Sequence, residues 1–123
     1  MAQSFRDLKV WQEGMLLAKD IYLMTNEFPK SELYGLTSQM RRCSVSVPAN
    51  IAEGSGRGSK KDFVQFLHIA QGSLRELETY LLLCEEIGLM TSIAISPLLT
   101  QVETVGKMLL GLLRSLETSK TSN

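Results

Sequence analysis

Apolar residues recur along this chain at spacings of three and four, the period of one face of an α-helix. Four segments carry such a stripe, and they predict helices over about residues 6–27, 33–56, 60–87 and 96–117. Four stripes of this kind can close on a common interior, so we predict an all-α fold. The expected architecture is an antiparallel up-down-up-down four-helix bundle in a single domain over residues 1–123, with a frayed polar tail over residues 118–123.

Helix-breaking and helix-capping residues separate the four segments. Pro29 disfavours helical backbone at the residue before it and so ends the first helix. The glycine-rich run over residues 54–58 ends the second helix, Ser59 is a suitable N-cap for the third, and Gly88 ends the third. The local chemistry therefore agrees with the periodicity.

Two prolines lie inside or near the predicted helices. Pro48 removes a backbone donor, at a cost of about 3 kcal/mol in a helix interior. The apolar stripe continues across it and predicts one helix that is kinked there. Asn50 is expected to satisfy backbone groups that the proline disturbs. Pro97 suits the first turn of a helix capped by Ser96, while Thr91 or its neighbour offers an earlier start.

The first helix carries two apolar stripes, which together cover roughly 200° of its circumference, whereas a bundle helix needs a little over 100°. The surplus fits either a helix deep inside a monomer or a contact with another copy of the chain. A small bundle has no second layer to cover such a face, which favours a homo-oligomer. The predicted interface residues are Val10, Leu17, Ile21 and Met24.

Residue types that enzymes and metal sites need are scarce. The single histidine, His68, falls opposite the apolar stripe of its helix with no second ligand on that face, so we expect it at the surface. The sequence holds no Glu-x-x-His pair, no nucleophile motif and no inward-facing pair of carboxylates. We therefore expect a protein that is not an enzyme, holds no metal or cofactor, and has no evident small-molecule substrate.

Cys43 and Cys84 are too few and too far apart for a disulfide scaffold or a CxxC site, and are expected to be buried free thiols. Apolar runs such as residues 81–84 are far too short to span a bilayer. The opening residues lack the pattern of a secretory signal. These observations predict a cytoplasmic protein that does not enter a membrane.

The chain has no net charge at neutral pH, but residues 41–61 carry a net +4 and residues 62–103 a net −5. Two lysines fall at the start of the third helix, where the helix dipole disfavours cations and backbone amides can bind an anion. Both a solvated connecting loop and a phosphate-binding segment fit this pattern. The second option gives the candidate nucleic-acid-binding residues Arg41, Arg42, Arg57, Lys60 and Lys61.

Several motifs resemble one protein family. They are VSVPANIAEG over residues 45–54, Gly56–Arg57, and FLxIAxGSLxELE over residues 66–78. This pattern resembles the signature of the four-helix-bundle proteins encoded in intervening sequences of bacterial 23S ribosomal RNA genes, also called S23 ribosomal proteins. The opening FRDLKVW and the later GKML fit as well, so the resemblance covers about residues 5–117.

The resemblance implies an antiparallel four-helix bundle that forms homopentamers, with no established enzymatic activity and with RNA binding proposed from gene context. A related bundle, the accessory protein of diversity-generating retroelements, is also a pentamer and binds nucleic acid and a reverse transcriptase. The sequence pI of about 6.6 leaves only a local basic patch for such a role. Two functions stay open: RNA binding through residues 41–61, or a protein–protein adaptor that binds no nucleic acid.

Overall fold

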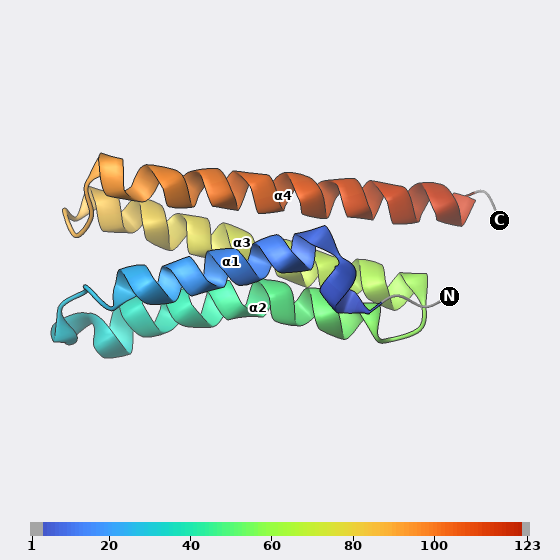
Figure 1. The fold of residues 1–123 in the computed structure, drawn as a ribbon, viewed down its shortest axis with the longest axis horizontal. Helices are drawn as coiled ribbons and strands as arrows, with labels where there is room; N and C mark the ends of the chain where they lie inside the picture. Colours follow the sequence, from blue (N-terminus) through green and yellow to red (C-terminus); the bar gives the residue numbers. More distant parts are fainter. Residues whose placement is uncertain (1–3, 122–123) are drawn as a thin grey trace.

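The computed structural model describes residues 4–121, with side chains described through residue 118. Four long helices run alternately in opposite directions (Figure 1). They are α1 (Lys9–Thr25), α2 (Ser38–Ser55), α3 (Lys60–Glu86) and α4 (Ser92–Thr121). Helix α2 packs against α1 and α3, and α4 packs against α3 and α1. The predicted all-α, up-down-up-down four-helix bundle is confirmed.

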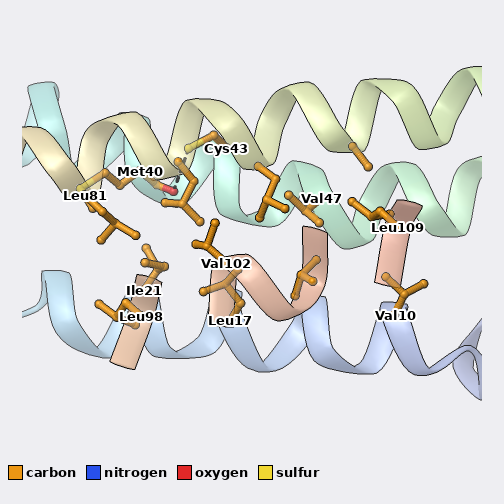
Figure 2. Close-up of a cluster of buried hydrophobic side chains, with 14 of the residues drawn as sticks. Val10, Leu17, Ile21, Met40, Cys43, Val47, Leu81, Leu98, Val102 and Leu109 are labelled. Carbon is orange, nitrogen blue, oxygen red and sulfur yellow. Dashed lines mark hydrogen bonds between the residues drawn. The ribbon is translucent and has the colours of Figure 1, made fainter. Parts of the chain in front are cut away.

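Each helix contributes one stripe of side chains to a common interior, part of which is drawn in Figure 2. Leu17, Met40, Leu74 and Leu109, one from each helix, have no exposed surface. Burying a side chain of this size stabilises the fold by about 1.5–3 kcal/mol. The stripe predicted for α3 lies in the interior from Leu67 through Cys84, so the periodicity identified this face correctly.

The stripe of α1 that we assigned to an oligomer interface faces this interior instead. Val10, Leu17 and Ile21 are 4%, 0% and 0% exposed, and Figure 2 shows Leu17 and Ile21 pointing into the same cluster as Val102 of α4. Met24 is partly buried against that cluster. The prediction of an uncovered face is wrong for Val10, Leu17 and Ile21, because the sequence shows two stripes but not which one meets the neighbouring helices.

The opposite side of α1 is the one left uncovered. Met15 and Tyr22, which belong to the other apolar stripe of this helix, are 46% and 42% exposed. Leu16 and Leu23 are also exposed, at 50% and 56%. Helix α1 therefore does carry a surplus of apolar surface, but on different residues from those predicted.

Helix α1 begins three residues later than predicted. A short 3-10 turn, Phe5–Asp7, precedes it, and the Ser4 hydroxyl accepts a hydrogen bond from the Arg6 amide at 3.1 Å. The Phe5 ring meets Trp11 edge-on, with ring centroids 5.2 Å apart. This aromatic contact holds the turn against the start of α1.

The segment predicted as the start of the second helix is irregular. Lys30–Glu32 forms a 3-10 turn and Leu33–Thr37 a π-type turn. Gly35 within it has φ −114° and ψ −110°, which is not helical. Helix α2 therefore begins at Ser38 rather than near residue 33, because the apolar period alone does not register the break at this glycine.

Helix α2 continues through Pro48, as predicted, and the proline ring is buried against Gly14 of α1. The Asn50 amide donates to the Ser46 carbonyl at 2.8 Å and to the Ser46 hydroxyl at 2.9 Å. The carbonyl that Pro48 leaves without its usual donor is that of Ser44. Asn50 thus has a backbone partner near the proline, but not the carbonyl that the proline leaves without a donor, so the expected compensation is not observed.

The caps of α3 are confirmed. The Ser59 hydroxyl accepts from the Asp62 amide at 3.1 Å, and Gly88 adopts a positive φ of 78° just after the helix end. Helix α4 starts at Ser92 rather than at Ser96, since the Thr91 hydroxyl caps it by accepting from the Ala94 amide at 3.1 Å.

The far end of α4 also differs from the prediction. The helix continues to Thr121, so residues 118–121 of the predicted frayed tail are helical, and residues 122–123 lie outside the described residues. Within the described part of the chain, no helix is long and apolar enough to cross a membrane.

Candidate nucleic-acid interface

The five basic residues predicted as one patch lie at two opposite ends of the bundle. Arg41 and Arg42 are near the start of α2, beside the α1–α2 connection, while Arg57, Lys60 and Lys61 flank the α2–α3 connection (Figure 1). Thirteen helical residues separate Arg42 from the end of α2 at Ser55, which corresponds to about 20 Å along the axis. A single patch over residues 41–61 is therefore excluded, because the helix between the two groups keeps them apart.

At the first end, the side chain of Arg41 ties α2 to the end of α1. Its Nε donates to the Thr25 hydroxyl and its Nη2 to the Asn26 Oδ1, both at 2.9 Å. Thr25 is buried, and its hydroxyl donates a hydrogen bond to the Ile21 carbonyl at 2.7 Å. The Arg41 guanidinium also lies over the Tyr22 ring, 4.8 Å from its centroid. These contacts fix the plane of the guanidinium against the aromatic face.

The neighbouring Arg42 and Tyr34 face solvent. Tyr34 is 92% exposed on the irregular turn before α2, and Arg42 is also exposed. A pocket of about 400 Å³ lies between them, and its lining comes from α1, the turn and α2: Tyr22, Leu33, Tyr34, Thr37, Ser38, Arg41 and Arg42. The structure thus brings two tyrosines beside two arginines.

Sequence reasoning missed both tyrosines. Tyr22 belongs to a different helix, and Tyr34 fell within a segment predicted to be helical. A signal was nevertheless present, because Pro29 and Gly35 are residues typical of turns and a tyrosine between them is suited to an exposed position.

At the opposite end, the basic side chains have other partners. Arg57 pairs with Glu53 at 3.1 Å and lies 5.0 Å from the centroid of the Phe66 ring. Lys60 and Lys61 are exposed in the first turn of α3. The small pocket there, about 220 Å³, is bordered by Gly58, Ser59 and Phe63. Phe63 and Phe66 are both partly buried, so the described residues at this end include no exposed ring comparable to Tyr34.

A further groove, of about 510 Å³, runs between α3 and α4. Its charged residues are balanced in sign: Arg75 and Lys107 against Glu78 and Glu103. Arg75 forms an ion pair with Glu78. Neither histidine nor cysteine lines the groove.

The two cysteines are buried free thiols, as predicted. Burial raises the pKa of Cys43 to about 12 and that of Cys84 to about 11. Thiols of this kind are protonated and unreactive at neutral pH. His68 is exposed, and its Nδ1 lies 3.3 Å from Gln71 Oε1. Among the residues with a described placement, no three His, Cys, Asp or Glu side chains gather as metal ligands.

Comparison with known proteins identifies the family. The sequence model of the 23S rRNA-intervening sequence protein family matches residues 6–111. A crystal structure of a protein of unknown function from the S23 ribosomal protein family of Bacteroides thetaiotaomicron is similar in fold, with a TM-score of 0.77. It is 22% identical in sequence, and the alignment covers 85% of this chain and 95% of that one. A search of the curated proteins gave no match. Because the family match extends over most of the chain, the protein belongs to the 23S rRNA-intervening sequence protein family.

Proposed function

We propose that this protein is a non-enzymatic RNA-binding bundle and that the contact lies at the α1–α2 end. The observation that carries this proposal is the pocket in which the exposed ring of Tyr34 lies beside Arg41 and Arg42. Arginines bind phosphate oxygens, and aromatic rings stack on bases. The two groups together match the two chemical parts of a nucleotide.

The charge of the region supports binding of an anion, though only modestly. Lys30, Arg41 and Arg42 oppose Glu27 and Glu32 around this end, so the local excess is small. Two arginine contacts on a single strand would give a log–log dependence of affinity on salt with a slope of about −1.4. We therefore expect weak, salt-sensitive binding by one chain. Several copies in one assembly would strengthen it through effective concentration.

The opposite end, with Lys60 and Lys61, is a second basic group that also faces solvent. It has a helix N-terminus but, among the described residues, no exposed aromatic ring. We assign the contact to the arginine end because phosphate and base can be bound there together. The Lys60 and Lys61 prediction is tested in the same experiment.

The test is fluorescence anisotropy of a labelled single-stranded RNA of mixed sequence, with protein purified under nuclease treatment and measured at about 100 mM salt. Arg42→Glu and Lys61→Glu change the net charge equally at opposite ends of the bundle. We expect Arg42→Glu to weaken binding strongly and Lys61→Glu to change it little. Equal losses from the two variants would move the contact away from the pocket. Absence of RNA affinity above that of a neutral control protein would favour the adaptor function.

A further inference from the structure

We infer that the pocket between Tyr34 and the two arginines binds one unpaired base of a single RNA strand, which stacks on Tyr34 while Arg42 contacts the adjoining phosphate. This inference rests on the proposed function and specifies its ligand. It distinguishes unpaired RNA from duplex, which phosphate contacts alone do not.

The ring of Tyr34 is exposed at the edge of the pocket. Its side chain is 92% exposed on the turn, and the adjacent Leu33 is 44% exposed. None of the described residues covers this ring. Trp11 and Tyr80 of the same chain are, by comparison, partly buried. An uncovered ring at a pocket edge is a surface on which a base of any sequence can stack.

The guanidinium of Arg41 is held in a fixed orientation. The Nε and Nη2 of Arg41 donate hydrogen bonds to Thr25 and Asn26, and its guanidinium lies over the Tyr22 ring. Its plane is therefore held in place before any ligand arrives, which lowers the entropy cost of binding. Arg42, in contrast, is exposed, and it can adjust to a phosphate.

The site consists of two adjoining pockets. A second pocket, of about 440 Å³, lies beside the first and shares Leu33, Thr37 and Arg41 with it. Lys30 borders this second pocket. Two adjoining pockets with a shared arginine suit successive units of a strand better than one isolated small molecule.

A base within a continuous RNA duplex does not fit this site. In an RNA duplex both faces of each base are covered by its neighbours, and the major groove is too narrow for side chains to read. Tyr34 can stack only on a base that has left such a stack. The site therefore favours single strands, loops and ends over continuous duplex.

The test uses an oligouridine that carries one 2-aminopurine, alone and as a duplex with its complement. Tyr34→Ala should weaken binding of the single strand by about 5- to 150-fold, the effect of losing one stacked base. Tyr34→Phe should retain affinity within about twofold, because the phenylalanine ring also stacks. Ile93→Ala is the matched control, since it shortens another apolar side chain that is 87% exposed and lies outside the pocket.

Stacking should also change the 2-aminopurine emission on binding by the unmutated protein and by Tyr34→Phe, but not by Tyr34→Ala. Circular dichroism should show that all variants are folded, since the side chains of Tyr34 and Ile93 are exposed and lie outside the interior. Equal affinity for single strand and duplex, with no effect of Tyr34→Ala but a loss in Arg42→Gln, would overturn the stacking inference and leave RNA binding intact. Absence of binding to both RNAs would overturn the proposed function itself.

Discussion

The interior side chains of this bundle stabilise it through burial. Leu74 lies at the middle of α3 with no exposed surface, and its Cδ2 reaches across to Gly106 of α4. Interiors are close-packed, so a shortened side chain leaves a cavity that the neighbours fill only in part. The energetic role of a leucine here depends on burial rather than on helix preference.

Leu74→Ala is expected to lower the free energy of unfolding by about 2–5 kcal/mol. Leu83→Ala is the control on the same helix, because Leu83 is 43% exposed. Urea unfolding followed by circular dichroism measures both variants. Equal small losses would mean that the α3 stripe does not face a packed interior.

The two thiols predict how stability depends on alkaline pH. An unfolded cysteine has a pKa of about 9.0, whereas burial raises the pKa of Cys43 to about 12 and of Cys84 to about 11 in the fold. The unfolded chain therefore loses these protons first. The stability that the neutral thiols contribute is complete below pH 9 and decreases as the pH rises from there through the folded pKa values.

Urea unfolding at pH 8 and at about pH 10 checks this expectation. Each thiol should contribute a decrease of at most about 1.4 kcal/mol per pH unit above 9. The variant with both cysteines replaced by alanine should show a smaller decrease over the same interval. The same slope in both proteins would assign the pH dependence to other groups.

At the scale of helices, glycines decide how closely α2 and α3 approach. A Cβ added at Gly54 would lie 2.6 Å from the Phe66 Cβ and 3.1 Å from the Phe63 Cδ1. The Ser46 and Ser73 hydroxyls, 2.8 Å apart, join the same two helices nearer their middle. Close backbone approach at one end and a polar contact in the middle set the packing of this pair.

Gly54→Ala should destabilise the protein by about 1–3 kcal/mol, because the added methyl must displace the Phe66 side chain or its helix. Gly72→Ala is the matched control, since nothing lies within 4 Å of its added Cβ. That variant should instead stabilise α3 by about 0.5–1 kcal/mol through the better helix preference of alanine. Thermal unfolding of both variants measures the difference. A neutral Gly54→Ala would show that the two helices can separate without cost.

For the whole molecule, the uncovered apolar surface of α1 is the feature that bears on assembly. The exposed side chains are Met15, Leu16, Tyr22 and Leu23. Val10, Leu17 and Ile21, which were first predicted for an interface, are buried within one chain, so a contact between copies through α1 would use this other side. Homo-oligomer formation itself stays a prediction.

We expect light scattering to give a mass above the 13.7 kDa of one chain. The double variant Leu16→Glu with Leu23→Glu should shift the mass toward one chain while retaining helical circular dichroism, because carboxylates lose hydration in an apolar contact. Ile69→Glu, at a residue 47% exposed on α3, is the control. A single-chain mass for the unmutated protein at micromolar concentration would contradict the prediction.

The local features of this protein follow from the order of its residues. The four helices, the caps at Ser59 and Gly88, the passage of one helix through Pro48 and the family motifs were all predicted. These features depend on the 3.6-residue period and on backbone hydrogen bonds between residues close in the chain. The exceptions were also local: the break at Gly35 and the cap at Thr91 each outweighed a weaker signal, namely the apolar period and the first-turn preference of Pro97.

Packing between helices sets which surfaces meet. An apolar stripe defines a direction relative to its own helix axis, but the neighbours define which direction is inward, and so Ile21 is buried and Tyr22 exposed. The same reason explains the candidate site. Arg41 and Arg42 were found from charge, but their separation from Lys60 follows from the length of α2. Their proximity to Tyr34 follows from the path of the turn, and contacts between such segments are set by packing rather than by spacing along the chain.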